Sequence, residues 1–211
     1  ITSLSESVLN QNILYAGTDD GLVQTTKDGG LTWISMSVDK LPGVPSTSFV
    51  NDIKADHFDS QVAYVALDNH KFGDYRPYLY KTSNGGKSWK PNVNGLPEDT
   101  FLWRIVQDHI DPNLLFLASE YGLYFSNNQG EKWIKFSTGL PTISIRDLAI
   151  QKRENDLVLA TFGRSFYVLD DYSSLRNLKE NITVKSHIFP IKKSLMYIDS
   201  RPLGSRGKGS Q

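Results

Sequence analysis

The sequence predicts an all-β fold made of four similar, four-stranded antiparallel units, and three observations predict it. A run of a hydroxyl residue, an acid or amide, glycine and tryptophan occurs three times and ends at Trp33, Trp89 and Trp133, at intervals of 56 and 44 residues. Four short apolar runs recur at a similar period: ILYAG, VAYVA, LLFLA and LVLAT. No stretch shows convincing helical periodicity. A period near fifty residues indicates a repeat architecture.

Each unit can be divided into strands in the same order. A first segment, beginning with an apolar residue at position 4, 53, 105 or 148, is followed by a polar corner and then by the apolar run. An alternating third segment comes next, and in three units a glycine turn leads to a last strand that opens on the tryptophan. Short strands of about 5–7 residues, four to a unit of about 45 residues, predict the blades of a β-propeller. The residues taken as equivalent in the second strands are Tyr15, Tyr64, Phe116 and Leu159.

The three tryptophan-containing runs predict structural turns. Asp and Asn side chains close turns by accepting hydrogen bonds from backbone N–H groups, glycine supplies a positive φ, and the indole ring fixes the turn to the sheet. A structural turn recurs in every unit, whereas a protein usually has one active site. The repetition of these runs therefore favours a structural role over a catalytic one. A calcium loop is the alternative, but the third copy has no acid before Glu131, and calcium sites use several carboxylates. The twelve positions are Thr26, Asp28, Gly30, Trp33, Thr82, Asn84, Gly86, Trp89, Ser126, Asn128, Gly130 and Trp133.

These runs resemble Asp-boxes, also called BNR repeats, of the form Ser/Thr-x-Asp-x-Gly-x-x-Trp. Such boxes occur in sialidases, xyloglucanase-type glycoside hydrolases, sortilin-type receptors and photosystem assembly factors. The segment GRSFYVLDDYSSL (163–175) resembles the closing blade of large bacterial BNR proteins called glycosyl hydrolase or sortilin-like. The resemblance covers about residues 1–175 and implies that each box joins the outer two strands of a blade, away from the ligand face. It implies a fold and no particular activity.

The predicted organisation is one propeller portion, residues 1–198, followed by a polar tail or linker, residues 199–211. Its blades are expected near 1–38, 49–94, 102–138 and 144–190, with Leu-Pro pairs between them. The start at Ile1 and the polar tail favour part of a larger, secreted, periplasmic or cell-surface bacterial protein, whose remaining blades would be partners. A closed four-bladed propeller is the alternative.

Composition excludes several classes of function. Lys+Arg and Asp+Glu both number 23, so no net charge favours nucleic acid, and no apolar run is long enough to span a membrane. Cysteine is absent, which excludes thiolate metal sites, and no metal or cofactor motif is recognisable. His57 and His109 recur at the same corner of their units, which favours a structural role over a metal pair.

A non-catalytic binding or scaffolding module is the predicted function, and a xyloglucanase-like or sialidase-like glycoside hydrolase is the alternative. A glycoside hydrolase needs two carboxylates across one cleft. Spacing selects no pair among the candidates, so the catalytic residues stay unknown; the candidates are Asp52, Asp68, Asp74 and Asp147. A sialidase needs an arginine cluster, for which Arg104, Arg146 and Arg164 on successive units are available.

The second unit carries an insert, DNHKFGDYRP (68–77), that departs from the repeat. Recognition residues are often placed on such loops. The insert follows a second strand and the Leu-Pro linkers follow fourth strands, so both should lie at the end of the blades opposite the glycine turns. We expect a carbohydrate or peptide to bind there, and a loop that only packs on its neighbour is the alternative. The candidate ligand face comprises His70, Lys71, Asp74, Tyr75, Arg76, Trp103 and Arg104.

Overall fold

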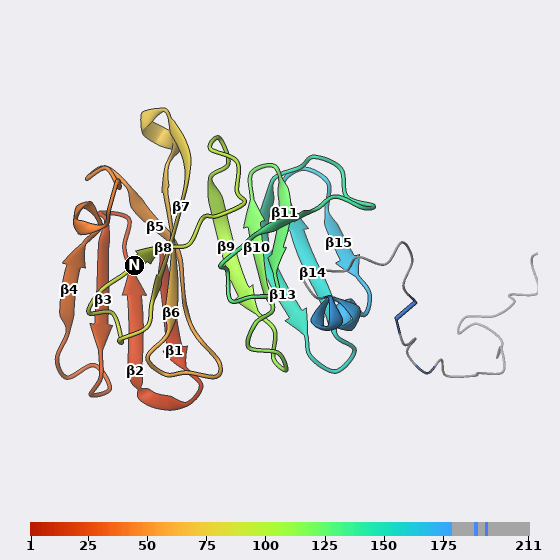
Figure 1. Ribbon diagram of the computed structural model, residues 1–211. Helices are drawn as coiled ribbons and strands as arrows, with labels where there is room; N and C mark the ends of the chain where they lie inside the picture. Colours follow the sequence, from red (N-terminus) through yellow and green to blue (C-terminus); the bar gives the residue numbers. More distant parts are fainter. Residues whose placement is uncertain (179–187, 190–192, 194–211) are drawn as a thin grey trace, which may run out of the picture.

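The computed structural model describes residues 1–178, 188–189 and 193, and it confirms the all-β fold class (Figure 1). Four antiparallel sheets follow one another along the chain, and each keeps its strands in sequence order. The first strands of neighbouring sheets adjoin one another, so the sheets are arranged as blades around a common inner side. The predicted tail, residues 199–211, lies outside the described residues.

The first three blades have four strands each. Blade 1 comprises β1 (Ser3–Ser7), β2 (Asn10–Gly17), β3 (Leu22–Thr26) and β4 (Ile34–Ser37). Blade 2 comprises β5 (Phe49–Ala55), β6 (Ala63–Asn69), β7 (Asp74–Thr82) and β8 (Lys90–Pro91). Blade 3 comprises β9 (Leu102–Gln107), β10 (Leu115–Ser119), β11 (Gly122–Ser126) and β12 (Ile134–Phe136). Two 3-10 turns, η1 (Val38–Lys40) and η2 (His70–Phe72), lie between strands.

In blade 4, three strands fall within the described part of the chain. They are β13 (Ile145–Gln151), β14 (Asp156–Thr161) and β15 (Phe166–Leu169). A 3-10 helix, η3 (Tyr172–Asn177), follows where the other blades have a glycine turn. Most of the residues between 178 and the expected end of this blade at 190 are not described.

The apolar core consists of layers between neighbouring blades. Because successive side chains of a strand point to opposite faces, each interior blade contributes to two layers. Tyr15 and Val65 pack between blades 1 and 2, Tyr64 and Leu117 between blades 2 and 3, and Phe116 packs toward blade 4. The layer between blades 3 and 4 also includes Tyr172 of the 3-10 helix that follows β15, whose ring lies edge-on to Phe116 with centroids 5.0 Å apart.

The register of blade 4 corrects one equivalence expected from the sequence. Ile105 pairs with Leu117 in blade 3, and Leu148 pairs with Leu159 in blade 4. Leu159 is therefore the counterpart of Leu117, and Val158, not Leu159, is the counterpart of Phe116. A slip of one residue moves a side chain to the other face of a sheet. Apolar residues occupy both faces of β14, so the alternation of residue types could not show which of its side chains face blade 3.

The three glycine turns share one hydrogen-bond pattern, so we call residues 26–33, 82–89 and 126–133 the box turns. The N–H of Gly30, Gly86 and Gly130 donates to the hydroxyl oxygen four residues earlier, at 3.0, 3.0 and 2.9 Å. A second backbone N–H, two residues after each glycine, donates to the Asp or Asn side chain at 2.9, 2.9 and 3.0 Å. All three glycines have φ between 82° and 95°, which explains why glycine stands there.

The three box-turn tryptophans differ in burial. Trp89 and Trp133 are buried, with 6% and 2% of their surface exposed, whereas Trp33 is 41% exposed. The Trp133 indole N–H donates to the carbonyl oxygen of Asn92 in the preceding blade at 2.8 Å, while that of Trp33 donates to Gly30 of its own turn at 3.1 Å. The Trp89 and Trp133 rings pack on the blade before their own, whereas no blade precedes Trp33 in the described chain.

Candidate functional site

The blades present two ends with different chemistry. At one end, the box turns lie against the turns between first and second strands, since the N–H of Gly85 donates to the carbonyl of Gln61 at 2.8 Å. At the other end lie the insert and the linkers, where the Thr47 hydroxyl donates to the side chain of Asn69 at 2.8 Å. In Figure 1 the insert before β7 projects on the side opposite the β7–β8 turn. The insert and the box turns thus occupy opposite ends.

The insert is held down by aromatic contacts with the linker into blade 3. The His70 ring stacks on Phe101 with centroids 4.8 Å apart and meets Trp103 edge-on at 6.0 Å. The His70 backbone N–H donates to buried Asp68 at 2.8 Å, and its ring Nδ1 pairs with the same carboxylate. The Lys71 ammonium lies 4.7 Å from the Phe49 ring centroid. His70 and Lys71 therefore anchor the insert, as the packing alternative predicted for this loop.

Asp74 and Arg76 form an exposed, ordered pair at the far end of the insert. The Arg76 guanidinium donates twice to the Asp74 carboxylate, at 2.9 and 2.8 Å, and the Tyr78 hydroxyl donates to it at 2.6 Å. The hydrogen bonds from Arg76 hold the pKa of Asp74 well below its usual range. Beside them the Tyr75 ring is 49% exposed and lies 6.1 Å from Phe101. Tyr75 is thus, with Phe72 at 65% exposure, one of two aromatic rings of the insert that are available to a ligand.

Blades 3 and 4 extend this surface with residues that the sequence did not single out as ligand contacts. The Arg146 guanidinium lies 3.8 Å from the Trp103 ring centroid and 5.2 Å from that of Phe162, which is 70% exposed. Glu120 lies 3.6 Å from the Arg146 guanidinium, and it accepts the Trp103 indole N–H at 3.0 Å and the Ser144 hydroxyl at 2.7 Å. The signal that could have found Glu120 and Phe162 is their place in the turns after second strands, while Arg146 lies near the start of β13, just after a linker. We call the array the aromatic surface, with the members Tyr75, Phe101, Trp103, Tyr121, Arg146 and Phe162.

Arg104 lies apart from the aromatic surface, although the sequence grouped it with Trp103. Ser3, Asp52, Arg104 and Asp147 occupy equivalent positions in the four first strands, as their pairings show. The Ser3 hydroxyl donates to Asp52 at 3.0 Å, and Arg104 lies 3.9 Å from Asp52 and 3.5 Å from Asp147. Neighbours in a strand point to opposite faces, which separates Arg104 from Trp103.

Of the four candidate acids, Asp52 and Asp147 thus share one arginine, while Asp68 and Asp74 belong to the insert. Burial raises the pKa of Asp52, whereas the Asp147 side chain is 65% exposed. The three arginines expected for a sialidase do not converge. Arg104 joins this chain of carboxylates and Arg146 stacks on Trp103 in another part of the surface.

His57 and His109 follow β5 and β9 at the box-turn end, and both line a cavity between the blades. Within residues 1–178, 188–189 and 193, no three His, Cys, Asp or Glu side chains are grouped as metal ligands. None of the helices in the same residues is long and apolar enough to cross a membrane.

No protein-family model matches this chain. Over 159 residues, 68% of the chain, it is 27% identical to a vacuolar protein sorting/targeting protein 10 of Pyrenophora teres f. teres, of which it covers 10%. The chain therefore spans about a tenth of that curated relative.

Three solved structures with the same fold are each longer than this chain. A GH74 enzyme of Niastella koreensis superposes with a TM-score of 0.64 at 14% identity, over 82% of this chain and 29% of that one. An ancestral GH74 enzyme gives 0.63 at 16% identity, over 81% and 24%. YCF48 bound to D1 peptide gives 0.56 at 15% identity, over 82% and 51%. At such identities these similarities show the fold alone, and the fold hosts both enzymes and binding proteins.

Proposed function

We propose that this chain is a non-catalytic binding module whose aromatic surface recognises an extended peptide. The observation that carries the proposal is the contact between Arg146 and Trp103. The guanidinium covers the indole face at 3.8 Å, so that face is closed to the flat stacking that a sugar ring would need. The Arg146 side chain is 39% exposed, so the outer part of its guanidinium is open to a ligand. A peptide carbonyl or carboxylate is a suitable partner for it.

The exposed rings around Arg146 complete the proposed peptide site. Phe162 is 70% exposed, Tyr75 49% and Tyr121 41%, and they come from three different blades. Separate aromatic anchors around a cation suit alternate side chains of an extended chain. YCF48, which shares the fold, has a solved structure bound to D1 peptide. That similarity supports a propeller as a peptide-binding scaffold and leaves the sequence of the peptide open.

The peptide proposal can be tested by selection from a random-peptide phage library, followed by fluorescence anisotropy of the selected peptides. Phe162→Ser and Tyr75→Ser should each weaken binding at least about tenfold, as expected for exposed aromatic anchors. Phe58→Ser is the matched control, because Phe58 is 41% exposed in the turn after β5, at the box-turn end. Equal binding by wild type and both surface variants would overturn the proposal. Binding of xyloglucan oligosaccharides that depends on the same rings would replace the peptide with a glycan.

The wider context of the module is also a proposal. We infer that the box turns are Asp-boxes, supported by their shared hydrogen bonds, and that the blades near 1–38, 49–94, 102–138 and 144–190 belong to a larger propeller of a secreted or cell-surface protein. The outward faces of blades 1 and 4 support this, since Leu4 is 62% exposed on one and Phe166 69% exposed on the other. Further blades would cover both faces.

A glycoside hydrolase is the second candidate, favoured by one observation. Asp52, whose pKa burial raises, and exposed Asp147 lie on either side of Arg104, and such unlike carboxylates suit acid and base roles. Against it, Arg104 stands between them where a glycosidic bond would have to lie. Incubation with xyloglucan should release no reducing ends. Release that Asp147→Asn abolishes would establish the enzyme instead.

A further inference from the structure

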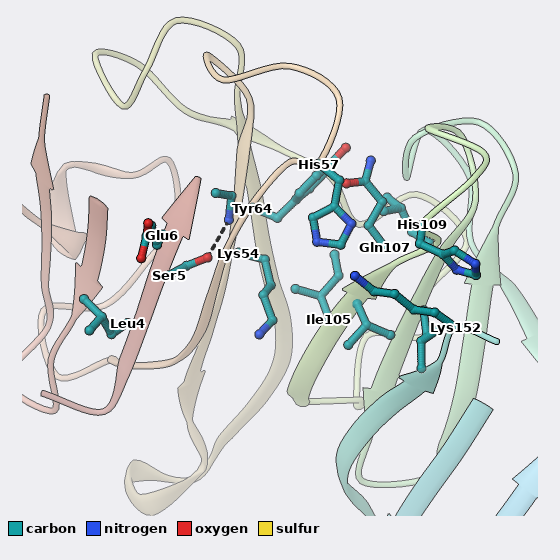
Figure 2. Close-up of a pocket in the computed structure, with 14 residues that line it drawn as sticks. Leu4, Ser5, Glu6, Lys54, His57, Tyr64, Ile105, Gln107, His109 and Lys152 are labelled. Carbon is teal, nitrogen blue, oxygen red and sulfur yellow. Dashed lines mark hydrogen bonds between the residues drawn. The ribbon is translucent and has the colours of Figure 1, made fainter. Parts of the chain in front are cut away.

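A cavity of about 390 Å³ opens between the blades on their inner side (Figure 2). All four first strands contribute to it, through β1, β5, β9 and the end of β13. His57 and His109 place it toward the box-turn end, because they lie in the turns after β5 and β9. The cavity is therefore separate from the aromatic surface at the opposite end, and a ligand bound in it would not depend on the proposed peptide site.

Two lysines from different blades reach into this cavity. Lys54 belongs to β5, and Lys152 follows β13. Figure 2 shows the Lys152 side chain directed toward the space below His57, while the Lys54 side chain extends downward on the other side of that space. Across the described chain, no carboxylate oxygen lies within 4.0 Å of either ammonium group. Among the described residues, Glu6 of β1 is the carboxylate that lines the cavity.

The buried acids behind the cavity are occupied by other groups. Asp56 accepts a hydrogen bond from the Gln107 side-chain amide at 2.7 Å and from the Phe58 backbone N–H at 2.8 Å. Asp108 accepts the Arg176 guanidinium at 2.6 and 2.8 Å. These carboxylates are satisfied within the fold and leave the two lysines facing the cavity.

The two histidines add proton-dependent donors to the same space. The His57 backbone N–H donates to Gln107 at 2.7 Å, which fixes the turn that carries the ring. Burial, and then the charge of Lys152, lower the pKa of His57, so its imidazole is neutral at neutral pH. The His109 ring lies 3.3 Å from both Asp108 and the Tyr172 hydroxyl.

We propose that this cavity binds the tetrahedral oxyanion of a small phosphate or sulfate ester, held between Lys54 and Lys152 with His57 and His109 beside it. Cations that approach from separate blades need a ligand with acceptor oxygens in several directions, and a tetrahedral group has three or four, whereas a carboxylate has two in one plane. Lysine binds such groups as a point charge. A volume of about 390 Å³ lies within the range of small-molecule sites.

The proposed site also predicts a direction of pH dependence. A bound anion raises the pKa of His57, so binding takes up a proton and strengthens as pH falls through the His57 pKa. The charged and titratable groups around the ring are Lys54 and Asp56 on its own side and Lys152, His109, Asp108 and Glu6 on the others. Sulfate keeps its charge between pH 5 and 8, so its affinity reports the protein groups alone.

The experiment is a calorimetric titration of the chain with inorganic sulfate, inorganic phosphate, glucose 6-phosphate and glucose at constant ionic strength. Glucose 6-phosphate should bind and glucose should not, and Lys54→Gln with Lys152→Gln should weaken binding at least about tenfold, as for loss of charge-assisted contacts. Lys71→Gln, at the opposite end, is the matched control and should bind normally. Binding of inorganic phosphate alone would show that the group itself is recognised, while binding of the ester alone would show that the sugar is needed too.

Two results would overturn the proposal. One is equal affinity of the wild type and the double lysine variant for glucose 6-phosphate, with both proteins folded by circular dichroism. The other is binding of glucose as tight as that of glucose 6-phosphate. Sulfate affinity that does not strengthen as the pH falls through the His57 pKa would remove His57 from the site. Phe162→Ser keeps the outcome separate from the peptide proposal, because it should leave anion binding unchanged.

Discussion

Replacing each box-turn tryptophan with alanine should destabilise the chain by amounts that follow their burial. A fully buried indole removes roughly 150–250 Å² from water, worth about 4–6 kcal/mol at about 25 cal/mol/Å². Trp133 is 2% exposed and its indole N–H is bonded to Asn92, so Trp133→Ala should cost about 4–5 kcal/mol. Trp89 is 6% exposed, and its indole nitrogen has no hydrogen-bond partner in the described chain, so about 3–4 kcal/mol is expected.

Trp33→Ala should cost only about 1–2 kcal/mol, because its ring is 41% exposed and its removal opens no closed cavity. Urea unfolding followed by far-UV circular dichroism measures all three, since fluorescence would change with every tryptophan removed. Trp133→Phe should recover part of the loss by refilling the space without the N–H. A Trp33→Ala variant as unstable as Trp133→Ala would refute the idea that each ring is stabilised by the blade before it.

Three further predictions concern local strain, a buried charge and the outer blades. Gly95→Ala should lower the free energy of unfolding in urea by about 1–3 kcal/mol more than Gly139→Ala does. The new Cβ at position 95 would lie 2.4 Å from a backbone oxygen of the next blade, whereas a Cβ at position 139 would have nothing within 4 Å. Equal costs would contradict this. Burial alone would raise the pKa of Asp108, but hydrogen bonds from Arg176 and Tyr172 lower it to about 2, so its contribution of about 2 kcal/mol is present above pH 4 and lost as pH falls toward 2. Arg176→Gln should therefore move acid unfolding to higher pH, and an unchanged midpoint would disprove the pairing. Light scattering should show concentration-dependent self-association of the isolated chain that Phe166→Ser reduces, and a monomer at every concentration would show that the outer faces need no cover.

The turns and strands were predictable because their causes are local. Hydroxyl, amide and glycine lie within four residues of one another in each box turn, and the same hydrogen bonds close all three. Alternating apolar residues identified the strands, and the order of turns along an antiparallel blade placed the insert opposite the boxes. These features depend on neighbours in the chain, which the sequence displays directly.

The candidate site was only partly predictable because its contacts join different blades. His70 was chosen as a ligand residue, yet it stacks on Phe101 and anchors the insert. Arg146 was named only as a candidate for the arginine cluster of a sialidase. Its position over Trp103 depends on how blades 3 and 4 pack together. The sequence did not identify Phe162, because an exposed aromatic residue in a turn indicates a binding site only when other aromatic rings lie beside it.

The sequence by itself determined the repeat, the blade, the box turns and the two unlike ends of this protein. The tertiary structure alone decided the one-residue register of β14, the exposure of Trp33, and the meeting of Lys54 and Lys152 in one cavity. The physical reason is that hydrogen bonds within a turn act over a few residues, whereas burial and charge depend on the next blade. Packing between segments about fifty residues apart decides which blade covers a ring. It also decides which charged groups face one another across the inner side of the blades.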